Sequence, residues 1–326
     1  MEYMDLKGRK YQYPKINISV PSRTHVDFDK IKEETFTWAA KFGIASGERK
    51  RYEKDNVTLV TCMAYHGGDY ERVLLVNKFT VNFFEIEDNI EMISDKRFFF
   101  GSLVHHGPEH KDLVALMDSS SEYEQIPLVV SFADVWKDLK AITTKRWQER
   151  FAQNYIGYLK SLIWVRKITA TQRPPSVAAY VEMRHYTSRI DFCNDFTEVA
   201  YKISVPDSVL TNVVIQRVNF LCSSIIGTVY DVYSYEKKRN ARLHNLIAVI
   251  KHEYKIGDQE AIEKAIAAIN EKFEKLQVTL RLLPTFEREL NDIVKIYIDG
   301  CLSMVTSNIV WGFGTDRYVV PKVLED

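Results

Sequence analysis

Apolar residues recur three or four positions apart along most of the chain from Val26 onward, which is the spacing of one face of an α-helix. The clearest case is the stretch from Thr143 to Ala170. Its large apolar and aromatic residues fall on one side: Trp147, Phe151, Tyr155, Tyr158, Leu159, Leu162 and Ile163. This pattern predicts a long helix that buries that side.

Proline and glycine divide the rest of the pattern into further helices. Pro108, Pro127 and Pro206 stand about where the first turn of a helix tolerates proline. Further helices are predicted at residues 27–42, 55–65, 69–91, 174–203, 258–283 and 284–311. Residues 1–25 contain Pro14 and Pro21 and are predicted to form an extended lead-in.

The pattern contains no pair of alternating strands, no internal repeat and no low-complexity segment. Several of the predicted helices are apolar on more than one face, which is typical of helices in the interior of a bundle. The sequence therefore predicts a lead-in at 1–25 and a single all-α domain at 26–326, built as a helical bundle.

Composition narrows the function classes. Lys plus Arg and Asp plus Glu balance at 44 each among 326 residues, so bulk charge gives no support for binding nucleic acid or an anionic membrane. The four cysteines lie far apart, which suggests neither a disulfide framework nor a zinc site. The N-terminus lacks the apolar core of a signal peptide, and no apolar run approaches a membrane span of about 20 residues. We therefore expect a soluble, reduced, cytoplasmic protein with no membrane span.

One helical stripe combines polar chemistry with an apolar context. Tyr230, Ser234 and Lys238 are spaced four residues apart, so they share one face of a helix. The apolar run 219–229 before them indicates that this helix passes through the interior. Buried polar groups are costly unless something pairs with them, so the stripe is a candidate site.

Carboxylates cluster at the end of the helix predicted at 69–91. Glu87 and Glu91 stand one turn apart, with Asp88 about 100° away. They repel each other and lie at the negative end of the helix dipole, and a divalent cation would reverse that cost. Oxygen ligands of this kind suit Mg²⁺. The alternative is a solvated acidic helix end.

Two basic positions complete the candidate chemistry. Arg184 follows the core-like residues Tyr180 and Val181, and a buried arginine needs a carboxylate or an anion. Arg317 and Tyr318 end a glycine-containing loop that follows Trp311 and could donate to phosphate oxygens. The alternatives are a structural ion pair for Arg184 and a disordered tail for the loop.

In this order, these features resemble those of class I terpene synthases, from about residue 55 to Tyr318. The segments 146–151 (Arg-Trp-Gln-Glu-Arg-Phe) and 173–187 also resemble sequences typical of that family. Arg184 precedes Tyr230 by 46 residues (230 − 184), close to the family's separation between its diphosphate-sensing arginine and its second metal motif. The resemblance implies a helical bundle that encloses an apolar cavity, with Mg²⁺ and diphosphate at the mouth.

Such enzymes remove diphosphate from a prenyl diphosphate and let the allylic carbocation cyclise in the cavity. The resemblance assigns catalytic roles to Arg184, Lys238, Arg317 and Tyr318, and metal binding to Glu87, Asp88, Glu91 and Ser234. It assigns substrate contacts to Phe79, Phe83, Phe84, Thr187, Ser188, Tyr230, Lys237 and Trp311. Core packing explains the three phenylalanines equally well.

The chain departs from the family at both metal motifs. Glu87 stands where the first motif normally begins with Asp. Tyr230 and Lys238 replace an Asn (or Asp) and a Glu of the second motif, and Glu236 faces elsewhere on the helix. Our leading hypothesis is a terpene synthase acting on farnesyl diphosphate, in which the Lys238 ammonium replaces a lost Mg²⁺. The alternatives are a non-catalytic protein that binds an apolar ligand, and a prenyltransferase. A homodimer is left open.

Overall fold

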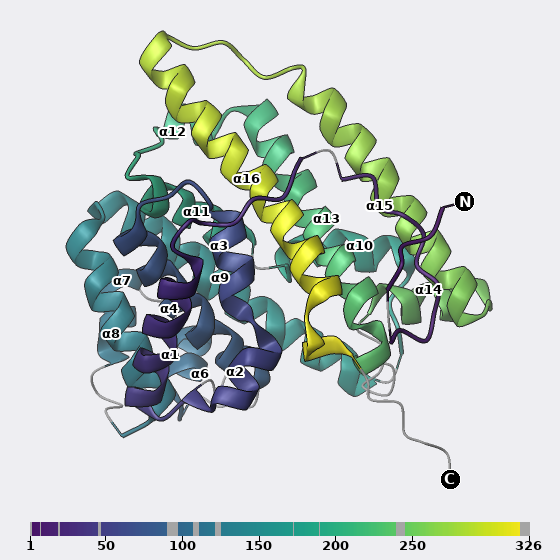
Figure 1. Ribbon diagram of the computed structural model, residues 1–326, viewed down its shortest axis with the longest axis horizontal. Helices are drawn as coiled ribbons and strands as arrows, with labels where there is room; N and C mark the ends of the chain where they lie inside the picture. The colour runs from purple at the N-terminus through teal and green to yellow at the C-terminus, as the bar shows by residue number, and fades with distance from the viewer. Residues whose placement is uncertain are drawn as a thin grey trace.

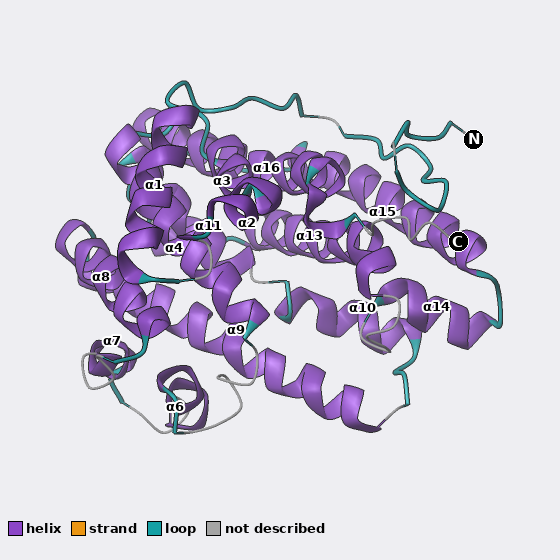
Figure 2. Ribbon diagram, turned by 60° about the horizontal axis from the view of Figure 1, so that its bottom comes forward, coloured by secondary structure: helices purple, strands orange, loops and turns teal. Residues whose placement is uncertain are grey.

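The computed structural model describes residues 2–6, 8–18, 20–44, 47–89, 97–106, 111–120, 125–171, 173–188, 190–238 and 245–319. Throughout these segments the regular structure is helical (Figures 1 and 2), and the one β-bridge joins Tyr3 to Pro14 in the lead-in. The all-α fold class is therefore confirmed.

The helices follow one another with short connections. The first half contains α1 (Phe28–Phe42), α2 (Arg49–Asp55), α3 (Val57–Ala64), α4 (Tyr70–Asp88), α6 (Phe99–His106), α7 (Leu113–Asp118), α8 (Pro127–Ile142) and α9 (Lys145–Thr171). The second half contains α10 (Val177–Tyr186), α11 (Ile190–Tyr201), α12 (Asp207–Leu210), α13 (Val213–Lys238), α14 (Leu246–Tyr254), α15 (Asp258–Leu280), α16 (Arg288–Gly314) and the 3₁₀ turn η3 (Asp316–Tyr318).

Two long apolar helices form the centre of the second half. Helix α13 packs against α15 and α16, and α16 also packs against α3 (Figure 1). By length and composition alone, Val213–Lys237 and Arg288–Gly314 are each long and apolar enough to cross a membrane, and the expectation of no membrane span stays a prediction. Their most apolar windows are 61% and 67% buried inside the bundle, and this burial accounts for their composition.

An aromatic cluster forms the core of the first half, where α4 packs on α8 and α11. Phe79 of α4 lies at its centre. Its ring centroid is 5.4 Å from that of Phe151, 5.6 Å from Tyr155 and 5.0 Å from Phe196. These rings meet at steep angles, an arrangement that aromatic quadrupoles favour. The stripe predicted on the helix at 143–170 therefore faces α4 and α11.

The helices differ from the prediction in several places, and neither α6 nor the part of α2 before Asp55 was predicted. Asn56 adopts a left-handed conformation (φ 43°), which separates α2 from α3 within the predicted helix 55–65. The helix predicted at 174–203 is divided into α10 and α11. At the end of α10 the Arg184 guanidinium donates to the Thr187 carbonyl oxygen (2.8 Å), so a side chain rather than a further helical turn satisfies that carbonyl. Helix α14 was not predicted.

The lead-in is tied to the helices that carry the C-terminal loop, over which it runs in Figure 2. Arg9 donates to three backbone carbonyl oxygens: Tyr233 of α13 (2.9 Å), Gly312 of α16 (3.4 Å) and Tyr318 of η3 (3.3 Å). The guanidinium therefore satisfies a carbonyl near the negative end of α16 and joins η3 to α13.

Burial of the Lys272 ammonium on α15 lowers the stability of the fold. Lys272 Nζ is buried and has no hydrogen-bond partner among the described residues. Burial lowers the pKa of Lys272 from 10.5 to about 8, so below pH 8 the folded state bears the full cost of the charge. Between pH 8 and 10.5 the unfolded chain binds more protons, and stability rises with pH.

Lys272→Met is therefore expected to raise the free energy of unfolding at pH 7 by about 2 kcal/mol. It should also flatten the rise in stability above pH 8. Urea unfolding at pH 7 and pH 9.5 measures both effects. Lys275→Met on the same helix is the control, because Lys275 is 54% exposed and paired with Glu271. Equal stabilisation by both variants would contradict the assignment.

Candidate active site

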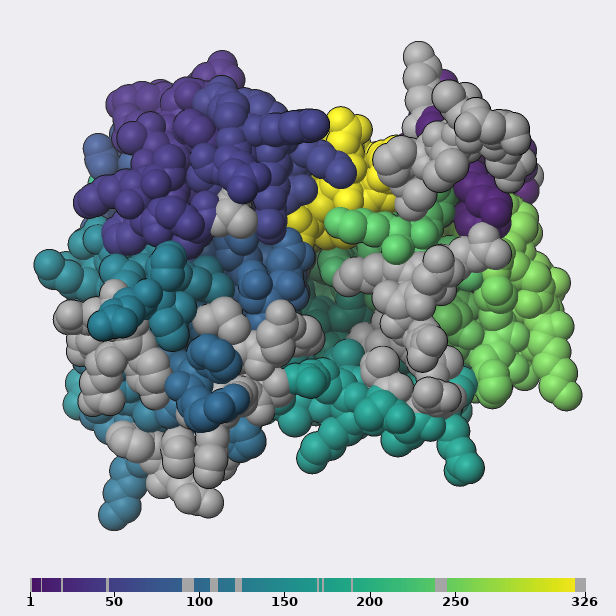
Figure 3. Space-filling model, turned by 90° about the horizontal axis from the view of Figure 1, so that it is seen from below, coloured from purple at the N-terminus to yellow at the C-terminus, as the bar shows by residue number. Residues whose placement is uncertain are grey.

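A cleft with a volume of about 300 Å³ opens where α4, α9, α10, α13 and η3 meet. Figure 3 shows a hollow near the middle of the corresponding face. The cleft is lined by Glu87, Asp88, Tyr158, Leu162, Val165, Arg184, Thr187, Ser188, Ile226, Gly227, Tyr230, Asp231, Lys237, Arg317 and Tyr318. The fold thus brings together most of the polar residues singled out in the sequence, from segments more than two hundred residues apart.

Two arginines occupy the acidic end of α4. Asp88 accepts from Arg317 through Oδ1 (2.7 Å) and from Arg51 through Oδ2 (2.8 Å). Arg51 also donates to Glu85 (3.2 Å), and Arg317 donates to the buried Asp55 (2.5 Å). Each oxygen of the Asp88 carboxylate therefore has a guanidinium partner.

The other predicted carboxylates are placed differently. Glu87 lines the cleft and accepts from the Tyr158 hydroxyl (2.6 Å). Glu91 lies outside the described residues, and α4 ends at Asp88. Within the described part of the chain, no group of three or more His, Cys, Asp or Glu residues is arranged to hold a metal ion.

Arg317 is a buried cation aimed between acidic groups. Its side chain is 7% exposed, and its guanidinium carbon lies 5.3 Å from the centre of the Phe84 ring. Burial alone would lower the pKa of Arg317, but the neighbouring acidic groups, Asp88 and Asp55 among them, outweigh it and raise the pKa. Its Nε is buried and has no hydrogen-bond partner in the described ranges, so one donor remains for a ligand.

Arg184 is held by a carboxylate that the sequence analysis did not select. Its Nε donates to Asp231 (3.1 Å) and to the Gly227 carbonyl (3.1 Å). Burial raises the pKa of Asp231, which the charge of Arg184 opposes. A Cβ atom at position 227 would approach Arg184 Cγ to 3.0 Å, so glycine allows the side chain to cross α13. The alternative of a structural ion pair holds, yet Arg184 also lines the cleft.

Tyrosine rings form the wall beside these arginines. The Tyr230 ring lies 5.4 Å from the Arg184 guanidinium carbon, and its centroid lies 6.0 Å from that of Tyr318. Lys237 Nζ lies 5.7 Å from the Tyr318 ring centre. Burial, and next the charge of Arg317, lower the pKa of Lys237. These contacts make Tyr230 part of a cation and aromatic cluster.

Two of the three remaining predicted residues on α13 and α16, Ser234 and Trp311, lie outside the cleft lining. Ser234 is fully buried, its hydroxyl has no partner among the described residues, and it is not part of the cleft lining, in contrast to its neighbour Tyr230. The Lys238 side chain lies outside what the structure describes. Trp311 is buried behind the cleft, where its indole N–H donates to the Asp55 carbonyl (3.0 Å).

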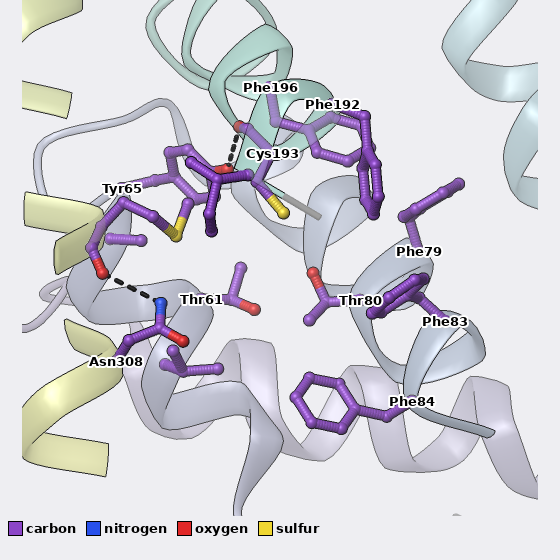
Figure 4. A pocket seen from close by; sticks show the side chains of 14 residues that line it. Thr61, Tyr65, Phe79, Thr80, Phe83, Phe84, Phe192, Cys193, Phe196 and Asn308 are labelled. Carbon is purple, nitrogen blue, oxygen red and sulfur yellow. Dashed lines mark hydrogen bonds between the residues drawn. The ribbon is translucent and has the colours of Figure 1, made fainter. Parts of the chain in front are cut away.

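Behind the cleft lies an apolar cavity of about 40 Å³ between α3, α4, α11 and α16 (Figure 4). Phe79, Phe83 and Phe84 line it, opposite Thr61 and Asn308, and their contact with a substrate stays a prediction. Cavities that hold organic ligands are typically about 300–1,000 Å³. The aromatic side chains therefore fill most of the space that a prenyl chain would need.

The arrangement suits one kind of chemistry. Cations from α10, α13 and η3 converge in the cleft next to carboxylates from α4, and the aromatic cavity adjoins the cleft, where Arg317 contacts Phe84. Such a mouth can bind an anionic leaving group, and aromatic faces can stabilise a carbocation. A profile described as "Terpene synthase family 2, C-terminal metal binding" matches residues 108–275, more than half of the chain. The chain belongs to this family.

Relatives and solved structures agree with this terpene synthase assignment. Pristinol synthase from Streptomyces pristinaespiralis is 24% identical over 93% of this chain and 84% of that protein. (+)-T-muurolol synthase ((2E,6E)-farnesyl diphosphate cyclizing) from Roseiflexus castenholzii is 23% identical over 89% of each chain. The crystal structure of a-eudesmol synthase has a TM-score of 0.78 at 16% identity, covering 92% of this chain and 99% of that one.

The resemblance inferred from the sequence is therefore confirmed for the family and the fold of this terpene synthase. Sequence reasoning missed Arg51, Asp55, Tyr158 and Asp231. Asp231 carried a signal, because it adjoins Tyr230 within the apolar part of α13. Arg51 and Asp55 sit on a short polar helix with no apolar periodicity, and the fold alone brings them to Asp88.

Proposed function

We propose that this protein ionises farnesyl diphosphate, releases diphosphate and cyclises the resulting carbocation. The observation that carries the proposal is the convergence of Arg184, Lys237 and Arg317 at the mouth of a cleft backed by an aromatic cavity. The relative from Roseiflexus is named as cyclising (2E,6E)-farnesyl diphosphate, which supports the choice of substrate.

In this proposal the cationic residues bind diphosphate, and the aromatic residues surround the carbocation. Arg317 Nε and the Lys237 ammonium would donate to diphosphate oxygens, and Tyr318 would hold both cations in place through its ring. Arg184 would donate from the opposite side of the cleft, oriented by Asp231. Phe83 and Phe84 would face the carbocation and exclude water.

The two metal motifs fit Mg²⁺ unequally. Glu87 and Asp88 line the cleft with carboxylates, a ligand type that suits Mg²⁺. A bound ion would displace a guanidinium partner of Asp88 and would act as a Lewis acid on the leaving group. At the second motif the donor set does not fit, because Tyr230 presents a ring and Ser234 is buried away from the cleft lining. We propose that Lys238 pairs with diphosphate in place of that second ion.

Arg51 should compete with a metal for Asp88. Removing one of the two guanidinium partners frees a carboxylate oxygen, so Arg51→Met is expected to tighten Mn²⁺ binding in the absence of diphosphate about fivefold. Electron paramagnetic resonance of free Mn²⁺ measures this without turnover. Arg49→Met is the matched control on the same helix, because Arg49 pairs with Glu33 and Glu53 instead. Weaker binding to the Arg51 variant would contradict the competition.

The direct test is incubation with geranyl, farnesyl and geranylgeranyl diphosphates, with Mg²⁺ or with EDTA, followed by gas chromatography and mass spectrometry. The expected result is a cyclic C15 product from farnesyl diphosphate, with weakened Mg²⁺ dependence. Complete loss of activity in EDTA, together with an ordinary three-metal cluster in a crystal, would contradict the role of Lys238.

The altered second motif favours one alternative, a protein that binds an apolar ligand without ionising it. Absence of diphosphate release from all three substrates would support that alternative. Product formation only when an acceptor is supplied would instead indicate a prenyltransferase. A cytoplasmic location stays a prediction.

A further inference from the structure

One wall of the aromatic cavity is polar. Thr61 of α3 and Asn308 of α16 lie together on the side opposite Phe79, Phe83 and Phe84 (Figure 4). Both residues are almost fully buried, at 3% and 4% exposure. Two helices thus bring a hydroxyl and a carboxamide to the same place in a cavity that is otherwise mainly aromatic and aliphatic.

The Thr61 hydroxyl is the polar group in this cavity whose surroundings indicate a bound ligand. Its Oγ1 is buried and has no hydrogen-bond partner among the residues that the structure describes. The Tyr65 hydroxyl donates to the Cys193 carbonyl (2.7 Å), and the Thr80 hydroxyl donates to the Val76 carbonyl (2.9 Å). A threonine hydroxyl often donates to the carbonyl one turn earlier in its helix, as Thr80 does, so the different state of Thr61 is informative.

A buried hydroxyl without a partner costs about 1–3 kcal/mol, which a bound water would recover. The cavity volume of about 40 Å³ exceeds the roughly 10–15 Å³ that one water requires. A water also needs two or more polar partners. Thr61 Oγ1 can donate or accept, and Asn308 has a carbonyl oxygen that can accept, while its Nδ2 donates to the Met304 carbonyl (2.9 Å).

We propose that Thr61 and Asn308 hold one water molecule that ends the reaction by attacking the carbocation, so that the released product is a terpene alcohol. This inference rests on the proposed function. It goes beyond it by assigning a nucleophile site and a class of product.

The atoms balance without an additional reagent. The C–O bond between the prenyl carbon and diphosphate breaks, and diphosphate leaves with the electron pair. A new C–O bond forms between the water oxygen and the carbocation. The oxonium then passes one proton to solvent water, and the released diphosphate finally takes that proton up. The sum is prenyl diphosphate plus water, giving an alcohol and protonated diphosphate.

This water lies away from the place where the first step, the loss of diphosphate, occurs. No described residue lines both the cleft and the cavity, so the Thr61 wall lies apart from the place where diphosphate leaves. The cavity of about 40 Å³ holds little more than this water, so the water meets the carbocation only after the aromatic side chains have moved to admit the chain. Early capture at the ionised carbon is therefore disfavoured, and capture after cyclisation is favoured.

The test uses the full-length protein with farnesyl diphosphate in H₂¹⁸O, and it measures the moles of alcohol formed per mole of diphosphate released. The expected wild-type product is mainly alcohol labelled with ¹⁸O. Thr61→Val removes the hydroxyl at nearly constant shape, so the alcohol fraction should fall at least fivefold, replaced by hydrocarbon. Asn308→Leu should act in the same direction, and Thr61→Ser should keep most of the alcohol.

Thr80→Val is the matched control, because it removes a hydroxyl that is already paired from the same cavity. Its alcohol fraction should equal that of the wild type. The inference is overturned if the wild type makes only hydrocarbon, or if neither Thr61→Val nor Asn308→Leu lowers the alcohol fraction. If Thr61→Val does not fold, Asn308→Leu and Thr61→Ser decide the question. Failure to release diphosphate from any prenyl diphosphate would instead reject the proposed function.

Discussion

Arg317→Met is expected to lower kcat/KM for farnesyl diphosphate about a thousandfold. The side chain is 7% exposed and ion-paired to Asp55 and Asp88, and its Nε is buried without a hydrogen-bond partner in the described residues. Loss of one preorganised donor to a developing anion typically costs about a hundredfold to a thousandfold. Arg317 also supplies charge, so the upper end is expected. Steady-state kinetics with a diphosphate-release assay measures the effect.

Two further variants separate chemistry from stability. Arg317→Met leaves the buried Asp55 carboxylate without its closest cation, which should also destabilise the fold. The double change of Asp55→Asn with Arg317→Met should recover most of that stability without recovering turnover. Arg317→Lys keeps the charge but loses the planar fork, and we expect an intermediate rate. Recovery of turnover in the double variant would show that Arg317 acts through stability alone.

The paired change Tyr230→Asn and Lys238→Glu recreates the residue types of the family's second metal motif, yet turnover is expected to fall about a hundredfold. Tyr230 packs against the Arg184 guanidinium and the rings of Tyr233 and Tyr318, and asparagine would lose these contacts. Such contacts are worth about 0.5–2 kcal/mol each. Ser234, the third member of the motif, is buried outside the cleft lining, so no complete ligand set results.

The two single changes show where the loss arises. Tyr230→Phe keeps the ring and should retain most of the activity, whereas Lys238→Met tests the ammonium by itself. Measurement of turnover over a range of Mg²⁺ concentrations shows whether the paired change adds a metal. A strong rise in turnover with Mg²⁺ in the paired variant would mean that the natural residues are a lesion and not part of the mechanism.

The fold could be predicted from the sequence because helical periodicity is strong and continuous. The ends of individual helices were harder to predict from the sequence. The break at Asn56 depends on one left-handed residue, and the break after α10 depends on a guanidinium from the same helix reaching the Thr187 carbonyl. Both are decided by local side-chain chemistry that periodicity does not report.

The site could be predicted where a residue's neighbours in sequence already indicated an unusual environment. Arg184, Asp88 and Tyr230 each combined polar chemistry with an apolar helix, and all three line the cleft. Ser234 did not follow from the same logic, because a four-residue step turns by about 40° around the helix, and Ser234 is not in the cleft lining although Tyr230 is. Arg51 could not be found, since its partners Glu85 and Asp88 come from another helix.

The contacts of Arg9 affect the point during synthesis at which the protein becomes able to catalyse its reaction. Arg9 and Tyr318 are 309 positions apart, and the hydrogen bond between them joins the lead-in to the turn that carries Arg317. Contacts of such long sequence separation form late, because the entropy cost of closing the loop between the two residues must be overcome first. The earlier helices can therefore begin to pack as they leave the ribosome, whereas the packing of α16 and the mouth of the cleft must wait until residues 288–318 have emerged. A nascent chain could bury the aromatic core around Phe79 without yet being able to release a reactive carbocation.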